Sequence, residues 1–344
     1  MKMMTEPRAF DLLTMGEIML RLSPPNNERI TRGDVLEKRA GGSELNVASG
    51  VSLLGLRSGI ITKLPDNPVG MFIRNWVRYC DVSDDYIVFD RDPDARLGIY
   101  YYENGAHPRK PRVVYDRKNS SMTRFSPDEI PDTVYASTRM FHTSGITLAL
   151  SESNRRAAIE MIRRFKQAGA QISLDVNYRA NLWSESDAYA TLQTVLPMVD
   201  VLFVSEETSR RMFRKTGTRD AIMRSYCTEY GVSVVAATDR VVINPHKHDF
   251  GSTIYDAESD RFFTEPPYRG IEVVDRIGSG DAYVSGVLFG LLRYGDLQQA
   301  LEFGNAASSL KDTIPGDLPS SDFAEVQRVI RDHQSTGPQS ELVR

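Results

Sequence analysis

DRIGSGDAYVSGVLFGLL, residues 275–292, places a glycine-rich turn directly before an apolar run with helical character. Gly278, Ser279 and Gly280 have little side-chain bulk, so their backbone N–H groups can converge on an anion. The helical run would put this turn at a helix N-terminus, where unpaired N–H groups and the helix dipole favour negative charge. We therefore expect residues 278–280 to form an anion hole.

Asp281 follows this turn and would lie in the first turn of the helix. A carboxylate beside an anion hole repels a bound anion, so binding alone does not explain it. It has a purpose if it accepts the proton of a hydroxyl group that attacks a phosphoryl group. Asp281 is thus a candidate catalytic base. The alternative is that it only caps the N-terminus of the helix.

Short apolar runs alternate with amphipathic stretches along most of the chain. This alternation is typical of buried strands separated by helices, and it predicts an α/β fold with right-handed crossovers and a mostly parallel sheet. We expect strands at 11–15, 59–63, 139–145, 171–176, 200–205 and 232–238, and helices at 44–54, 68–79, 151–168, 186–197, 206–214, 281–293, 296–311 and 321–333.

Two segments, 18–40 and 95–117, interrupt this alternation because they are polar, aromatic and rich in turn residues. The second predicts a hairpin with strands at 97–103 and 112–116. Together the two segments favour a small β-sheet lid on a single unit spanning 1–335, followed by a flexible tail at 336–344. Exposed lid strands also offer an edge through which a homo-oligomer can form.

The composition is that of a soluble globular protein, with 344 residues, 41% hydrophobic and 26% charged. A net charge of -4 argues against a nucleic-acid partner, and no apolar stretch reaches the length of a membrane span. The N-terminus has no signal-peptide pattern. Cys80 and Cys227 are too few for a disulfide framework and have no metal-ligand spacing. We therefore expect a cytoplasmic protein in which both cysteines are packing residues.

The second motif is GGSELNVASGVSLLG at 41–55. Gly41 and Gly42 permit a close approach of the backbone to a ligand, and Asn46 would lie on the same face of the following helix. Paired glycines before a helix are also common in ordinary βα connections. The stretch has no G-x-G-x-x-G pattern, which argues against a nicotinamide dehydrogenase.

The order and separation of G-G-x-x-x-N and D-x-x-G-x-G-D resemble the ribokinase-like, or PfkB, carbohydrate kinases over essentially the whole chain. The family usually has D-T-x-G-A-G-D, so Arg276 replaces Thr and Ser279 replaces Ala. The 2-keto-3-deoxygluconate kinases are the most similar subfamily, chiefly through DVNYRANLW at 175–183 and also through segments at 16–30, 62–70, 142–151 and 310–318. The resemblance implies a three-layer sandwich with a small β-sheet lid.

The resemblance also implies substrate-binding residues. They are Gly41, Gly42, Asn46, Tyr100, Tyr115, Arg117 and Arg179. A planar guanidinium such as that of Arg179 suits the carboxylate of a sugar acid. A cation at Arg21, roughly where ribokinases have a sugar-binding aspartate, would also suit an acid.

Each of these residues has a plainer interpretation. Arg179 could pair with Asp175 or with a surface carboxylate, and Tyr100 could serve only to pack the sheet. Arg117 lies in a run of cationic residues of the kind that usually faces solvent.

ATP with Mg²⁺ is the phosphoryl donor that the resemblance implies, with a monovalent cation (K⁺) near the 275–281 loop in relatives. Ser205, Gly278, Gly280 and Asn305 would contact the nucleotide. Two departures from the family's motifs affect the residues expected to bind the nucleotide and its metal. The N-x-x-E motif is replaced by Ser205-Glu206-Glu207-Thr208, where Glu206 or Glu207 would contact the metal through water. The stretch 234–252 lacks the family's K-x-G-x-x-G loop, and its His246, Lys247 and His248 are expected in an exposed loop.

The resulting hypothesis is phosphorylation of a sugar acid at its primary hydroxyl, with 2-keto-3-deoxygluconate giving the 6-phosphate. One alternative is a kinase for a neutral sugar of the fructose or ribose type, against which the arginines argue. The other is a sensor that binds a sugar acid without catalysis, suggested by the altered 205–208 and 236–251 segments.

Overall fold

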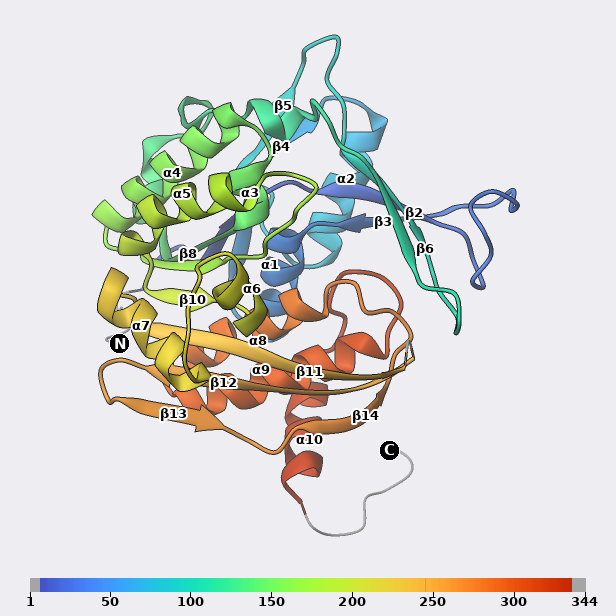
Figure 1. Ribbon diagram of the computed structural model, residues 1–344. Helices are drawn as coiled ribbons and strands as arrows, with labels where there is room; N and C mark the ends of the chain where they lie inside the picture. The colour runs from blue at the N-terminus through green and yellow to red at the C-terminus, as the bar shows by residue number, and fades with distance from the viewer. Residues whose placement is uncertain (1–6, 245, 336–344) are drawn as a thin grey trace.

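A large, mostly parallel sheet forms the middle layer of the computed structural model, which describes residues 7–244 and 246–335 (Figure 1). Within that range the sheet has ten strands in the order β13-β12-β11-β10-β9-β8-β1-β4-β5, with β14 paired to β12. The parallel strands are β1 (Phe10–Met15), β4 (Ser58–Pro65), β5 (Ile87–Asp90), β8 (Thr138–Ser144), β9 (Gln171–Asp175), β10 (Val201–Phe203) and β11 (Val234–Asn244). All six predicted strands are confirmed.

Helices cover both faces of this sheet (Figure 1). Adjacent residues of β1 point to opposite sides, so Leu12 and Leu13 pack into different cores. The Leu12 side carries α1 (Ser43–Leu53), α2 (Pro68–Tyr79), α8 (Ser279–Tyr294), α9 (Leu297–Asp312) and α10 (Phe323–Gln334). The Leu13 side carries α3 (Gly145–Ala149), α4 (Glu152–Gln167), α5 (Glu185–Val195), α6 (Glu206–Arg211) and α7 (Arg219–Tyr230). This is the predicted three-layer sandwich.

A separate four-stranded sheet stands beside the main body and forms the lid (Figure 1). Its strands, in the order β3-β2-β6-β7, are β2 (Met19–Ser23), β3 (Glu37–Gly41), β6 (Ile99–Glu103) and β7 (Arg112–Asp116). They come from the two segments predicted to form it. Every residue of the edge strand β7 is exposed, although nothing in a single chain tests the predicted oligomer.

The sequence-based expectation was wrong in the stretch after β10. The helix α7 was missed, because its buried apolar side chains are only Ile222, Met223 and Tyr226. The predicted loop beyond residue 238 is instead the second half of β11, which pairs antiparallel with β12 (Lys247–Asp256). The antiparallel strands β13 (Arg261–Thr264) and β14 (Tyr268–Glu272) follow.

Lys247 and His248 therefore do not lie in a loop but begin β12, and only His246 occupies the exposed turn. His248 is buried, with its Nε2 atom 2.8 Å from a carboxylate oxygen of Asp312. The residues described contain no helix long and apolar enough to cross a membrane. The expected tail at 336–344 falls outside the described range.

Candidate active site

A cavity of about 450 Å³ lies where the lid meets the carboxyl end of β9 and the N-terminus of α8. Ten of the predicted site residues line it. They are Gly42, Asn46, Tyr100, Tyr115, Arg117, Arg179, Gly278, Ser279, Gly280 and Asp281. Residues far apart in the sequence therefore meet at one place, as both motifs require.

The predicted anion hole is the N-terminus of α8, a helix of 16 residues whose N-cap is Gly278. Gly278 has a φ of 87°, and a Cβ atom added to it would lie 2.0 Å from the carbonyl oxygen of Asp317. Only glycine satisfies both conditions. A Cβ on Gly280, in contrast, would meet nothing within 4 Å, so the turn is open on the side of the cavity.

Asp281 is held by two hydrogen bonds from α1. Ser43 Oγ donates to its Oδ1 at 2.7 Å, and Asn46 Nδ2 donates to its Oδ2 at 2.6 Å. Burial raises the pKa of Asp281 to about 6, while these two donors act in the opposite direction. The carboxylate is therefore oriented and has a pKa near neutrality, as a general base requires.

Asp175, the last residue of β9, lines the same cavity. Burial raises the pKa of Asp175 to about 7, and the negative charge of Asp281 adds to this effect. Two carboxylates that influence each other titrate as a pair. Asp175 was not selected from the sequence, because a single aspartate at a strand end gives no signal without its neighbour in space.

The three residues of the glycine–asparagine motif do not all line the cavity, in contrast to the prediction. Gly42 lines the cavity, but Gly41 does not. A Cβ atom on Gly41 would lie 2.4 Å from a carboxylate oxygen of Asp317 and 2.8 Å from the hydroxyl of Tyr100, so this glycine makes room for that pair. Asn46 lines the cavity and also positions Asp281.

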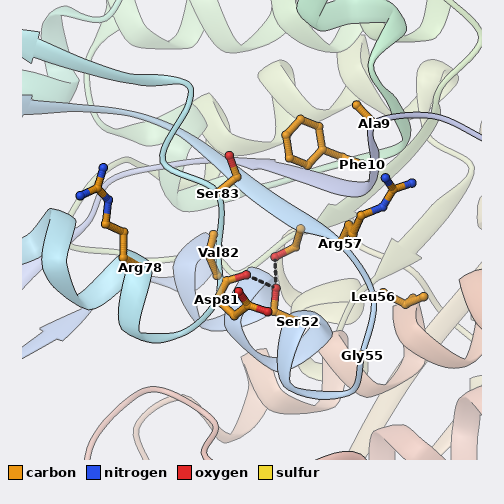
Figure 2. A pocket seen from close by; sticks show the side chains of 11 residues that line it. Ala9, Phe10, Ser52, Gly55, Leu56, Arg57, Arg78, Asp81, Val82 and Ser83 are labelled. Carbon is orange, nitrogen blue, oxygen red and sulfur yellow. Dashed lines mark hydrogen bonds between the residues drawn. The ribbon is translucent and has the colours of Figure 1, made fainter.

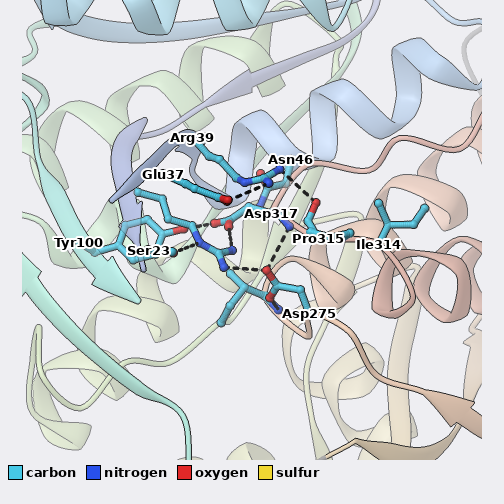
Figure 3. Close-up of polar contacts among 12 residues, drawn as sticks. Ser23, Glu37, Arg39, Asn46, Tyr100, Asp275, Ile314, Pro315 and Asp317 are labelled. Atoms are coloured by element: carbon cyan, nitrogen blue, oxygen red, sulfur yellow. Dashed lines mark hydrogen bonds and ion pairs between the residues drawn. The ribbon is translucent and has the colours of Figure 1, made fainter. Parts of the chain in front are cut away.

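A buried cluster of charges joins the lid to the anion-hole loop (Figure 3). Arg21 of β2 donates to Asp317 Oδ1 at 2.6 Å and to Asp275 Oδ2 at 2.7 Å. Its Nε donates to Ser23 Oγ at 2.8 Å, and Tyr100 donates its hydroxyl to the other oxygen of Asp317. Burial alone would lower the pKa of Arg21, but the two carboxylates hold it above its usual value.

The expectation that Arg21 recognises an acidic substrate was therefore wrong. Its guanidinium is 3% exposed, does not line the cavity, and already binds two carboxylates. Tyr100 is also buried, and burial together with Asp317 raises the pKa of its hydroxyl, which stays protonated as a donor. Asp317, which lines the cavity, was missed in the sequence because LKDTIPGDL carries no general chemical signature.

Four arginines line the cavity and differ in how far they are already paired. Arg117 donates to Glu17 Oε2 through Nε at 2.8 Å and also through Nη2. Arg179 donates only to the carbonyl oxygen of Tyr178, at 3.2 Å, among the described residues, so the alternative of an ion pair with Asp175 is wrong. Partial desolvation and the charge of Arg276 lower the pKa of Arg240. The cavity thus has cations available to an anionic ligand.

A second cavity, of about 210 Å³, adjoins the first and shares four lining residues with it, Asp175, Asn177, Arg179 and Gly280. Ser205 lines this cavity at the N-terminus of α6, where its hydroxyl accepts a hydrogen bond from the backbone N–H of Thr208 at 3.1 Å. Asn305 lines neither cavity: it is fully buried and donates to Glu265 at 2.6 Å.

Glu206 and Glu207 also lie outside both cavities. The carboxylate of Glu206 binds Arg210 at 2.6 Å and Arg219 at 3.2 Å. The structure therefore gives no support to a contact between these glutamates and a metal.

A third cavity, of about 460 Å³, opens at the opposite edge of the sheet, beside the first residues of β1 and β4 (Figure 2). The hydroxyls of Ser52 and Ser58 bond to each other at 2.8 Å. Arg57 donates to the carbonyl oxygen of Arg8, and Arg78 donates to Asp84. Because these groups are already paired, this cavity is not a candidate for chemistry.

Comparison with known proteins agrees with this geometry. The architecture is ribokinase-like, and the crystal structure of 2-dehydro-3-deoxygluconokinase from Thermotoga maritima matches with a TM-score of 0.88 and 32% identity, covering 93% of this chain and 98% of that one. The family model for pfkB family carbohydrate kinases matches residues 9–321. The chain therefore belongs to the pfkB family, and it is a sugar kinase.

Two relatives indicate the range of named activities around it. The 2-dehydro-3-deoxygalactonokinase of Haloferax volcanii is 36% identical over 93% of this chain and 96% of its own length. The 5-dehydro-2-deoxygluconokinase of Shouchella clausii is 29% identical over 89% of this chain and 90% of its own length.

Replacing Arg21 by methionine tests the buried charge cluster. Arg21→Met keeps most of the side-chain volume but leaves two carboxylates buried without their cation, so we expect the free energy of unfolding to fall by about 3–5 kcal/mol. Urea unfolding measures this change. Arg39→Met is the matched control, because that lid arginine is 36% exposed, pairs with an exposed glutamate, Glu37, and otherwise donates only a long hydrogen bond of 3.5 Å to the carbonyl oxygen of Pro315 among the described residues. Equal stability of the two variants would contradict the assigned role of Arg21.

Proposed function

We propose that this sugar kinase transfers the γ-phosphoryl group of ATP to the primary hydroxyl of a 2-keto-3-deoxy sugar acid. The first candidate is 2-keto-3-deoxygluconate, giving the 6-phosphate. The observation that carries the proposal is the cavity itself, which Asp281 and the open turn at Gly280 line together with four arginines. The galactonate epimer is the second candidate, because a 36%-identical relative is named for it.

The position of Asp281 sets the orientation of the substrate. The reacting hydroxyl must lie at Asp281, so the carboxylate, at the other end of a six-carbon chain, must lie away from it. Tyr115 of the lid strand β7 and Arg117, just after that strand, line the cavity. Both suit the carboxylate end of the substrate. Arg117 uses Nε and Nη2 for Glu17, and its Nη1 makes no further hydrogen bond within the described residues.

Arg179 belongs at the reacting end. It lines both cavities, together with Asp175 and Gly280, and its positive charge lowers the pKa of Asp281. A guanidinium at this junction suits the phosphoryl group in transfer better than a distant carboxylate. We therefore propose Arg179 as a phosphate ligand and Arg117 as the ligand of the acid, whereas the sequence resemblance implied that both bind the substrate.

The transfer follows from these positions. Asp281 orients the hydroxyl and accepts its proton as the new O–P bond forms. The N–H groups of the turn at 278–280 stabilise the charge on the transferred phosphoryl oxygens. Tyr100 and Tyr115 of the lid cover the sugar and exclude water that would otherwise hydrolyse ATP.

Mg²⁺ fits this site as a companion of the nucleotide. The described residues contain no group of three or more His, Cys, Asp or Glu side chains that could hold a metal, and Mg²⁺ is usually bound by one or two carboxylates plus the phosphates of the substrate. Asp175, between the two cavities, is the carboxylate in a position to help hold it. When bound, the ion would neutralise charge on the phosphates.

Coupled ADP release with MgATP tests the proposed function. We expect turnover with 2-keto-3-deoxygluconate or its galactonate epimer, little with gluconate, fructose or ribose, and loss of turnover by at least about 10²-fold in Asp281→Asn with binding retained. Turnover on a neutral sugar would overturn the acid specificity. Binding of a sugar acid without any ADP release would favour a sensor, and an active Asp281→Asn variant would contradict the assignment of the base.

The two arginines give a second prediction. Arg117→Met removes a ligand of the substrate carboxylate, so we expect KM for the sugar acid to rise with little change in kcat. Arg179→Met removes a ligand of the phosphoryl group, so we expect kcat to fall. Steady-state kinetics with both substrates varied distinguishes these patterns. The reverse pattern would exchange the two assignments.

The pH dependence of kcat/KM gives a third prediction. Asp281 accepts a proton only when it is ionised, so activity should fall as the pH drops through its pKa of about 6, close to the value of about 7 for Asp175. Ser43→Ala removes a hydrogen bond that favours the ionised form, and we expect the acidic limb of the profile to move to higher pH. An acidic limb that does not move would show that this bond has no influence on the base.

A further inference from the structure

Lys311 carries a buried positive charge behind the anion hole. It lies in the last turn of α9 and is 1% exposed. Its Nζ donates to the carbonyl oxygen of Asp275 at 3.0 Å and to the carbonyl oxygen of Ile314 at 3.1 Å. Asp275 is the first residue of the anion-hole loop, and Ile314 is the first residue of the segment that leads to Asp317.

The ammonium group completes a neutral cluster. Arg21 and Lys311 supply two positive charges, and Asp275 and Asp317 supply two negative charges, with none of the four side chains more than 4% exposed. The nearby Asp312 faces His248 instead. Without Lys311 the cluster would retain an excess negative charge beside two carbonyl oxygens that have lost their donor, which is costly in a buried environment.

Monovalent cations bind at sites lined by main-chain carbonyl oxygens and excess negative charge. In this chain the ammonium group of Lys311 occupies such a site. The expectation of a free K⁺ near the 275–281 loop therefore does not fit, because the carbonyl oxygens that would coordinate the ion already accept hydrogen bonds from Lys311.

We infer that Lys311 is a built-in monovalent cation that holds the anion-hole loop in place and makes this kinase independent of K⁺. Lys311 is a positioning residue, since it reaches neither cavity. Its effect is transmitted through close contacts: Gly316 N donates to Asp275 Oδ2 at 3.0 Å, and Gly278 packs directly on the carbonyl oxygen of Asp317.

The test compares three variants of the full-length protein in KCl, NH₄Cl and tetramethylammonium chloride at equal ionic strength. Lys311→Ala removes the charge and leaves space for an ion. Lys311→Met removes the charge but fills the space. Lys215→Ala is the control for loss of a buried lysine elsewhere, since Lys215 is 9% exposed and pairs with Glu229 at 2.5 Å.

Two readouts are needed, because the kinetic one rests on the proposed function. Thermal unfolding requires no substrate, and ADP release with the sugar acid reports the loop. We expect wild-type turnover and melting temperature to be the same in all three salts. For Lys311→Ala in tetramethylammonium we expect turnover to fall by about 10²-fold, with K⁺ or NH₄⁺ restoring both readouts and neither ion restoring Lys311→Met or Lys215→Ala.

Three results would overturn the inference. One is a wild-type enzyme that requires K⁺ or is stabilised by K⁺ over tetramethylammonium. Another is a Lys311→Ala variant that responds equally to all three salts, and the third is a Lys311→Ala variant that loses neither stability nor turnover. If Lys311→Ala does not fold in any of the three salts, a wild-type enzyme that requires K⁺ or is stabilised by it would still overturn the inference. If no sugar acid is turned over, the proposed function fails, while the melting temperatures still test the cation.

Discussion

The ion pairs of Arg21 with Asp317 and Asp275 are the interaction on which the site depends. They connect a strand of the lid to the loop that forms the anion hole, across more than 250 residues of sequence. Burial makes each charge dependent on its partners, because an unpaired ion in this environment is strongly unfavourable. The cluster therefore holds the lid and the turn at 278–280 in position together.

Asp281 is held in position by hydrogen bonds that do not come from this cluster. Asp281 lies on α8 next to the loop, yet its two hydrogen-bond donors come from α1. Asp281 is thus positioned by residues of the early motif, whereas the turn at 278–280 adjoins the buried charge cluster. This arrangement accounts for the pairing of a glycine–asparagine motif early in the chain with a glycine–aspartate motif near its end.

The parts of the site that could be predicted from the sequence are those with a local signature. The turn at 278–280 and Asp281 are recognisable because glycine content and helix position act within a few residues. The strands of the central sheet are likewise marked by continuous apolar runs. Asp175 and Asp317 could not be found in this way, because their importance arises from neighbours brought together by the fold.

Arg21 shows a second limit of prediction from sequence, because a residue type does not reveal its partners. A cation beside a substrate cavity and a cation inside a buried ion cluster look the same in a sequence, and only the partners distinguish them. The hairpin of β11 and β12 shows another limit. Residues 247–252 (KHDFGS) are mostly polar or turn-forming, yet they form a strand because they pair with residues 238–244 of β11.

The lid is attached unequally at its two sides. Its inner strands are tied to the body through Arg21 and Tyr100, whereas β7 pairs with β6 alone among the described strands and is exposed along its whole length. Displacing the inner strands would separate the buried charges of Arg21, Asp275 and Asp317, while β7 is anchored at its end by the ion pair of Arg117 with buried Glu17. The inner strands of the lid are consequently held by more buried polar contacts than the exposed edge strand β7, on which Tyr115 lies.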